Sequence, residues 1–229
     1  MSIIICDLDG VLVNFVEGAY RAHNRLSEYK EGETPTGWDF YEDWGMTEEE
    51  FWVPIHAEGA AFWDTLSPYP WSQQIIDLLL SGKYGGFILS TSPSRDPSSW
   101  IGKYNWIKHT FGLRFKDYTI TECKWKLAHP DALLIDDSDA NCEKFDKWDG
   151  SSILFPGAWN KNKKLANDPM SYVLPLLDEW YAMQTEMTGY QDDSVEDLGF
   201  IKIDEHALQG YLEARDETRR SRNTPEIGY

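Results

Sequence analysis

The chain has 229 residues, a length that suits one α/β domain with an insert. Its 39 acidic and 21 basic residues give a formal net charge of -18, which argues against a surface that binds nucleic acid or an anionic membrane non-specifically. A hydrophobic content of 41%, with 11 tryptophans, excludes a disordered polymer.

The chain begins with a strand and a helix, followed by a segment of different composition. Residues 1–6 are apolar and largely β-branched, which is typical of a strand buried in a parallel sheet. The strand ends at Asp7-Leu8-Asp9-Gly10, and residues 11–28 then predict a helix. Residues 31–69 are rich in glycine, proline, acidic and aromatic residues, and we expect a small helical insert there.

Helical and strand patterns alternate in the next part of the chain. Alternation of this kind indicates a parallel, doubly wound sheet with helices on both faces. The sequence therefore predicts a Rossmann-like α/β fold with a small helical cap inserted after the first strand. We expect helices over residues 72–80 and 100–111, strands over 87–90, 118–120, 132–135 and 152–155, and a polar loop over 91–99.

Changes in composition divide the chain into three parts. A core domain would comprise residues 1–15 and 70–182, and the cap would comprise residues 16–69. Residues 183–229 turn polar, with acidic residues followed by arginines, and predict a peripheral helical or flexible tail without a catalytic pattern. If the chain forms a homo-oligomer, we expect this tail to make the contact.

The cysteines and the apolar segments indicate the compartment. Cys6, Cys123 and Cys142 are odd in number and widely spaced, so they fit neither a disulfide framework nor a zinc site. No run approaches the roughly 18 apolar residues of a membrane span. The start of the chain also lacks the basic and apolar regions of a signal peptide. These patterns predict a cytoplasmic protein with no membrane partner.

Polar pairs follow three of the predicted strands where each strand ends. In an open α/β sheet the carboxyl ends of the strands form the edge at which ligands bind. A single strand-end aspartate often only caps the next helix. Two pairs of aspartates at one edge would repel one another unless a cation lay among them, and Mg²⁺ prefers such oxygen ligands. The pairs are Asp7 and Asp9, Thr91 and Ser92, and Asp136 and Asp137.

These residue types suit phosphoryl transfer. A carboxylate beside Mg²⁺ can attack phosphorus, and a second carboxylate two residues on can protonate the leaving oxygen and later activate water. Thr91 and Ser92 offer donors to phosphate oxygens, and a lysine ahead of the strand at 132–135 offers a compact positive charge. The spacing to Asp136 favours Lys126 for this charge, whereas the pattern Lys-x-x-x-Ala favours Lys124.

Four sequence marks occur in order along the chain: Cys-Asp-Leu-Asp-Gly-Val-Leu at 6–12, Leu-Ser-Thr-Ser-Pro at 89–93, a lysine at 124 or 126, and Leu-Leu-Ile-Asp-Asp at 133–137. With these marks the chain resembles the haloacid dehalogenase-like phosphohydrolases over residues 3–155. More narrowly, it is similar to the 5'(3')-deoxyribonucleotidases of the cytosolic type C family, which include phage and bacterial members. The narrower resemblance rests on Phe15, on Phe51-Trp52-Val53, on Thr91-Ser92-Pro93, and on Lys103-Tyr104-Asn105-Trp106 followed by Phe111-Gly112.

The resemblance implies catalytic and metal-binding roles. Asp7 would be the nucleophile and a Mg²⁺ ligand. Asp9 would be the acid/base and would bind Mg²⁺ through its backbone carbonyl. Asp136 and Asp137 would hold the ion directly or through water.

The resemblance also implies roles in substrate binding. Thr91, Ser92 and the lysine at 124 or 126 would hold the phosphate. Phe15, Phe51 and Trp52 would form an apolar slot for the base and the deoxyribose, although ordinary packing of a small cap also explains aromatic residues there. An arginine often follows the aspartate pair in the family, and this chain has Ser138 instead.

We therefore expect a Mg²⁺-dependent phosphatase that acts on nucleoside monophosphates, most specifically on 5'(3')-deoxyribonucleotides. The substrate would be a small-molecule nucleotide and no nucleic-acid polymer. One alternative is a phosphatase of sugar phosphates or polynucleotide ends, although the acidic net charge opposes a polynucleotide. Another is a non-catalytic binding module on the same fold, which the intact set of aspartates opposes.

Overall fold

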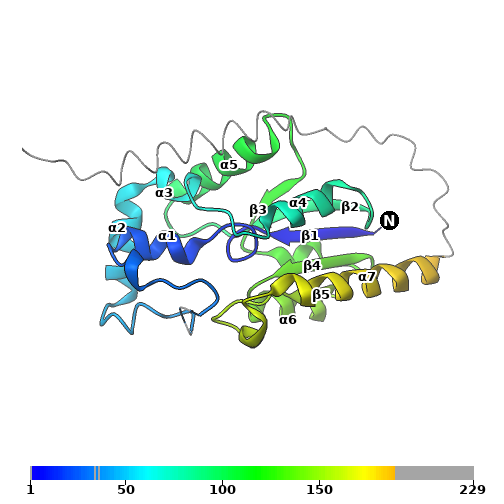
Figure 1. The fold of residues 1–229 in the computed structure, drawn as a ribbon. Coiled ribbons are helices and arrows are strands. Elements are labelled where there is room, and N and C mark those ends of the chain that lie inside the picture. Colours follow the sequence, from blue (N-terminus) through cyan, green and yellow to red (C-terminus); the bar gives the residue numbers. More distant parts are fainter. Residues whose placement is uncertain (1, 34, 36, 189–229) are drawn as a thin grey trace, which may run out of the picture.

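The computed structural model describes residues 2–33, 35 and 37–188. A five-stranded parallel sheet forms its centre, with the strand order β3-β2-β1-β4-β5 (Figure 1). The predicted α/β fold is confirmed, and each predicted strand is present within two residues of its expected bounds. The strands are β1 (Ile3–Asp7), β2 (Gly86–Thr91), β3 (Tyr118–Ile120), β4 (Ala132–Asp136) and β5 (Ser151–Leu154).

Helices cover both faces of the sheet because successive strand residues point to opposite sides. Ile4 and Cys6 of β1 belong to the main hydrophobic core, which α4 (Ser72–Leu80), α5 (Ser98–Phe111) and α7 (Pro169–Thr188) complete. Ile5 points to the other face, where it packs with Phe145 of α6 (Asp139–Lys147) and with the end of the 3₁₀ helix η2 (Lys124–Leu127). Both faces of β1 and β4 are therefore buried, as their apolar sequences predict.

The helix predicted over residues 11–28 is shorter than expected. Residues 8–13 form a tight turn in which the backbone amides of Leu12 and Val13 both donate to the carbonyl of Leu8. Helix α1 (Phe15–Ala22) then begins at Asn14, whose side chain accepts from the amide of Glu17 at 2.8 Å. Left-handed backbone at Asn24, with φ +57°, follows the helix and precedes the 3₁₀ helix η1 (Leu26–Glu28).

The insert contains two further helices, α2 (Glu48–Glu58) and α3 (Ala60–Asp64), as its composition suggests. A capping box starts α2: the Thr47 hydroxyl accepts from the amide of Glu50, and the Glu50 carboxylate accepts from the amide of Thr47. Helix α3 lies against α5 of the core, and Gly102 allows the contact. A Cβ atom on Gly102 would lie 2.4 Å from the Ala60 carbonyl oxygen.

The remaining elements follow β5. The 3₁₀ helix η3 (Lys163–Leu165) leads into α7, which runs beside β5 (Figure 1). The segment 189–229, which holds most of the predicted tail and oligomer contact, lies outside the described residues. Among the described helices, none has the length and apolar content needed to cross a membrane.

Candidate active site

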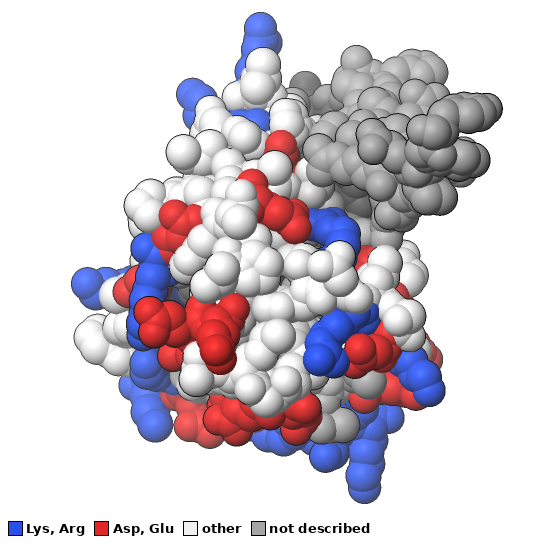
Figure 2. Space-filling model, turned by 90° about the vertical axis from the view of Figure 1, so that its left-hand side faces the viewer, with Lys and Arg blue, Asp and Glu red and all other residues white. Residues whose placement is uncertain are grey.

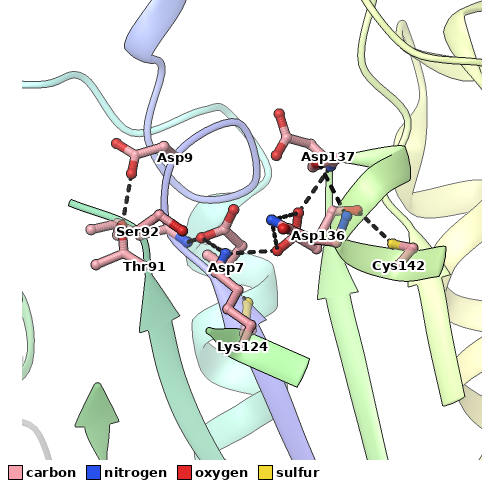
Figure 3. A network of polar contacts seen from close by, with 12 residues as sticks. Asp7, Asp9, Thr91, Ser92, Lys124, Asp136, Asp137 and Cys142 are labelled. Atoms are coloured by element: carbon pink, nitrogen blue, oxygen red, sulfur yellow. Dashed lines mark hydrogen bonds and ion pairs between the residues drawn. The ribbon is translucent and has the colours of Figure 1, made fainter. Parts of the chain in front are cut away.

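Three aspartates from two neighbouring strands meet at the carboxyl edge of the sheet. Asp7 ends β1, Asp136 ends β4 and Asp137 follows it, and pairing of β1 with β4 places the two strand ends side by side (Figure 3). One carboxylate oxygen of each residue lies within 4.8 Å of the others, and all three residues are buried. The aspartates that the sequence separates by more than a hundred positions thus form one cluster.

Lys124 is the lysine that reaches this cluster. Its ammonium nitrogen lies 2.6 Å from Asp7 Oδ1 and 2.6 Å from Asp136 Oδ2, and the side chain is 2% exposed. Burial alone would lower the pKa of Lys124, but the charges of Asp7 and Asp136 raise it above its ordinary value. Lys126, the other candidate, is exposed, and Lys124 is the buried residue of η2.

The cluster carries more negative charge than Lys124 neutralises. Burial raises the pKa of Asp7 from 3.8 to about 7, against the opposing effect of Lys124, and Asp136 and Asp9 raise it further. Burial, together with the charges of Asp7 and Asp136, also raises the pKa of Asp137. Buried carboxylates of this kind are relieved by a cation bound among them. Their oxygen atoms are also the donor type that suits Mg²⁺.

The carboxylate of Asp136 is held on both oxygens. Oδ1 accepts from the Ser138 amide at 2.9 Å, and the Asn141 side chain donates to Oδ1 at 3.1 Å and to Oδ2 at 3.2 Å. Ser138 itself caps α6. The residue that stands where the family often has arginine therefore starts a helix that brings Asn141 to the cluster.

A loop after β5 holds Asp137. The indole Nε1 of Trp159 donates to Asp137 Oδ2 at 2.8 Å, and the Asn160 side chain donates to the Asp137 carbonyl at 2.9 Å. Gly10 makes room for the carboxylate, because a Cβ atom there would lie 2.1 Å from Asp137 Oδ2. A side chain at position 10 would therefore clash with Asp137, which explains the glycine after Asp7-Leu8-Asp9.

Asp9 belongs to a second polar group beside the cluster. Its Oδ2 accepts from the Thr91 hydroxyl at 2.8 Å and from Lys103 Nζ at 2.5 Å, and Lys103 also donates to the carbonyl of Ser92. Asp9 Oδ1 is buried and has no hydrogen-bond partner among the described residues. The Thr91 hydroxyl is therefore engaged by Asp9. The Ser92 hydroxyl donates to the carbonyl of Thr121 at 3.3 Å, and Ser92 lines a cavity above the aspartates.

A cavity of about 1190 Å³ opens above the aspartates. Asp7, Asp9, Lys124 and Asp137 line its floor. Aromatic side chains from the start of α1, from the insert and from the loop after β5 form its walls. The residues that line the cavity also include the charged Glu48, Glu49 and Arg95. The aromatic lining residues are Phe15, Trp38, Trp52, Trp63 and Trp159.

Phe15 and Trp52 lie on the cavity wall, but Phe51 does not. The Phe15 ring stacks near Trp63 at 5.6 Å and near Trp38 at 6.2 Å between centroids. Phe51 is 3% exposed and stacks on His23 at 5.2 Å, inside the insert. Neighbouring residues on a helix face different directions, so α2 presents Trp52 to the cavity and Phe51 to the interior.

Several residues that complete the site were not singled out as site residues from the sequence. Trp38 and Trp63 belong to the aromatic-rich insert, which was the available signal for them. Lys103 lies in the Lys-Tyr-Asn-Trp motif, but the motif does not predict its contact with Asp9. Asn141, Trp159 and Asn160 carry no motif signal, and only their hydrogen bonds to Asp136 or Asp137 reveal them.

The sequence matches a family model described as "5' nucleotidase, deoxy (Pyrimidine), cytosolic type C protein" over residues 1–167. The match includes every candidate site residue in the sheet, the insert and the loop after β5. No curated protein matches the sequence significantly.

Solved structures with a similar fold are hydrolases and a mutase. A putative beta-phosphoglucomutase from Thermotoga maritima has 16% identity and a TM-score of 0.50, and the match covers 78% of this chain and 99% of that one. A HAD family hydrolase from Deinococcus radiodurans, with bound phosphate and sodium, has 13% identity, a TM-score of 0.44 and coverages of 82% and 96%. A HAD family enzyme from Bacteroides thetaiotaomicron, complexed with magnesium and inorganic phosphate, has 17% identity, a TM-score of 0.38 and coverages of 72% and 98%. At these identities the likeness concerns the fold alone.

Proposed function

Because the chain belongs to the family of deoxy (pyrimidine) 5'-nucleotidases of cytosolic type C, we propose that it hydrolyses 5'(3')-deoxyribonucleotides with the help of Mg²⁺. Membership of this family makes it a phosphoric monoester hydrolase. The observation that carries the proposal is the convergence of Asp7, Asp136 and Asp137 beside Lys124, on the floor of a cavity with aromatic walls. The floor suits a phosphate and the walls suit a nucleobase.

Asp7, Asp136 and Asp137 are the residues that would hold Mg²⁺, with the Asp9 backbone carbonyl as a further ligand. Their buried oxygen atoms and their uncompensated negative charge fit a hard divalent cation. When bound, the ion would neutralise charge on the phosphate oxygens. Lys124 and Ser92, which both line the cavity, would hold the remaining phosphate oxygens.

Asp7 would be the nucleophile. Its contacts with Lys124 and with the Leu8 amide both end on Oδ1, at 2.6 and 2.7 Å, which leaves Oδ2 for the substrate. Oδ2 forms a bond to phosphorus while the bond from phosphorus to the ester oxygen breaks. The leaving oxygen takes a proton from Asp9, and the products of this step are a nucleoside and an aspartyl-phosphate.

Water would complete the reaction. Asp9, now ionised, accepts a proton from a water molecule as its oxygen bonds to phosphorus, and the bond between phosphorus and Asp7 breaks to release inorganic phosphate. Thr91 and Lys103 hold Asp9 Oδ2, so Oδ1 is the oxygen that we expect to carry the proton. Thr91 would thus orient Asp9, and its predicted contact with the phosphate stays a prediction.

Phe15 and Trp52 would contact the base, together with Trp38 and Trp63. Stacking of a base on an aromatic ring contributes about 1–3 kcal/mol. Phe51 would not contact the base and would instead support Trp52, since the two rings pack against each other. The insert would close over a bound nucleotide and exclude water from the reaction.

Substitution of Asp7 by asparagine tests the proposal. We expect Asp7→Asn to reduce phosphate release from deoxyribonucleoside monophosphates by at least about 10⁴-fold, because the amide is a poor nucleophile. The circular-dichroism spectrum should be unchanged, since the substitution removes a buried charge and keeps the side-chain shape. Turnover by this variant at the wild-type rate would refute the assignment of Asp7.

The substrate is tested separately with a panel of compounds. We expect Mg²⁺-dependent release of phosphate from deoxyribonucleoside 5'- and 3'-monophosphates at higher kcat/KM than from ribonucleotides, sugar phosphates or a 3'-phosphorylated oligonucleotide. Preference for a sugar phosphate or for the oligonucleotide would refute the proposed substrate but would still agree with a phosphoric monoester hydrolase. Absence of Mg²⁺-dependent release from every compound would refute the proposed activity.

A further inference from the structure

The loop after β5 is built around the contact with Asp137. The backbone amide of Phe155 donates to the carbonyl of Asp136 at 2.8 Å, which continues the pairing of β4 with β5. Asn160 then ties the loop together: its side chain donates to the carbonyls of Asp137 and Phe155, at 2.9 and 2.8 Å, and it accepts from the amide of Gly157. The loop is therefore fixed to Asp136, which ends β4, and to Asp137, which follows it.

The Trp159 ring packs against Gly157, which has no side chain to exclude it. A Cβ atom on Gly157 would lie 2.7 and 2.8 Å from two ring carbons of Trp159, which is closer than real Cβ contacts allow. The ring lies close against this glycine, and its Nε1 donates to Asp137 Oδ2 at 2.8 Å. The same ring lines the cavity and lies 5.9 Å from the ring of Trp38.

We infer that Trp159 is a positioning residue that couples the metal site to the nucleotide-binding cavity, an inference that rests on the proposed function. Its N–H group fixes one oxygen of Asp137 and so holds this carboxylate in one orientation within the cluster. Its ring, which lies 5.9 Å from that of Trp38, is also part of the aromatic wall of the cavity. The Trp159 side chain would thus increase the affinity for Mg²⁺ through its N–H group and the affinity for the substrate through the face of its ring.

The two roles can be separated with matched substitutions. Trp159→Phe removes the N–H donor and keeps an aromatic ring, and Trp38→Leu removes an aromatic face that has no contact with Asp137. Loss of a hydrogen bond to a metal ligand typically weakens metal binding about 10–100-fold. We expect Trp159→Phe to raise the Kd for Mg²⁺ by this factor while KM for the nucleotide, at saturating Mg²⁺, changes less than about 3-fold. We expect Trp38→Leu to raise KM and to leave the Kd for Mg²⁺ unchanged.

The Kd for Mg²⁺ should be measured calorimetrically on the full chain without substrate, so that the readout does not depend on turnover. Trp148→Phe, at a 58% exposed tryptophan, is the control for removal of an indole. Gly157→Ala is a second variant, because its methyl group would displace the Trp159 ring, and it should also weaken Mg²⁺ binding. Equal melting temperatures without Mg²⁺ would show that the variants fold.

The results distinguish the inference from the proposed function. Wild-type affinity for Mg²⁺ in Trp159→Phe, or a loss of the same size in Trp38→Leu, would overturn the role of Trp159 and leave the nucleotidase intact. A wild-type protein that binds no Mg²⁺ and releases no phosphate would overturn both.

Discussion

At the scale of single residues, Lys124 has the largest effect on the charge of the site. Its ammonium group is the cation in direct contact with both Asp7 and Asp136, and all three side chains are at most 8% exposed. Removal of one partner from a buried ion pair leaves the others without compensation and costs about 3–5 kcal/mol.

We therefore expect Lys124→Met to lower the free energy of unfolding by about 3–5 kcal/mol and to abolish phosphate release. Denaturant titration and a phosphate assay would measure the two effects. Lys126→Met is the matched control, because Lys126 lies two positions away and is exposed. Equal losses in both variants, or none in Lys124→Met, would contradict the assignment of Lys124.

The raised pKa of Asp7 predicts how the metal-free protein responds to pH. The native state binds the Asp7 proton with a pKa of about 7, whereas the ordinary value is 3.8. Between these values the native state holds more protons than the unfolded state, so the free energy of unfolding should fall as pH rises through this window. This loss is the reverse of that expected for an aspartate whose pKa is lowered in the native state.

Mg²⁺ should reverse the loss, because it favours the ionised carboxylates. We expect Mg²⁺ to raise the melting temperature more at about pH 8 than at about pH 5, where protons compete for Asp7. Differential scanning fluorimetry with and without Mg²⁺ at both pH values would measure this. A Mg²⁺-induced shift that is larger at the lower pH would contradict the carboxylate site.

At the scale of secondary-structure elements, the contact between α3 and α5 fixes the insert to the core. Gly102 lies at this contact, and its neighbour Lys103 places its ammonium group 4.6 Å from the centre of the Trp63 ring while it binds Asp9. Two adjacent residues of α5 therefore contact the cavity wall and the acid/base residue: Gly102 lies against Trp63, and Lys103 binds Asp9. A shift of α3 against α5 would disturb both.

Substitution of Gly102 tests this coupling. A methyl group there would lie 2.4 Å from the Ala60 carbonyl oxygen and 2.5 Å from Trp63 Cβ. We expect Gly102→Ala to destabilise the protein by about 1–3 kcal/mol and to lower kcat/KM, because backbone and ring must move apart. Gly86→Ala is the control, since nothing lies within 4 Å of the added methyl group. Full activity and stability in Gly102→Ala would contradict the tight contact.

At the scale of the whole molecule, the net charge of -18 opposes the approach of a phosphate ester. Figure 2 views the end of the molecule that carries α1, α2 and α3, and acidic side chains appear there in several separate groups with basic side chains around them. The positive groups that would favour the substrate, Lys103 and Lys124, are buried at the cavity floor.

Salt should therefore assist the reaction. We expect kcat/KM for a dianionic nucleotide to rise a few-fold as NaCl increases from about 20 to about 200 mM at constant free Mg²⁺, because the Debye length falls below about 10 Å. Steady-state assays over this range would measure the effect, with an uncharged osmolyte as the control for viscosity. A steep fall with salt would indicate that local positive charge dominates the encounter.

The parallel sheet and the identity of the acidic residues followed from the sequence by itself. Apolar strands that end in Asp7 and Asp136 predict a parallel sheet, and parallel strands bring their carboxyl ends to one edge whatever the connections are. Local sequence patterns were enough to predict the cluster at that edge, because a few adjacent residues carry each pattern. The family resemblance rested on the same short segments.

Contacts between distant segments were decided only by the tertiary structure. Lys124 and Lys126 were equivalent candidates until η2 turned the first inward, since residues two apart on a 3₁₀ helix face different directions. Helix α2 likewise buried Phe51 and exposed Trp52 to the cavity. Trp159 and Asn160 reach Asp137 across more than twenty positions. No local pattern encodes such a hydrogen bond, because its partners become neighbours only after the chain has packed.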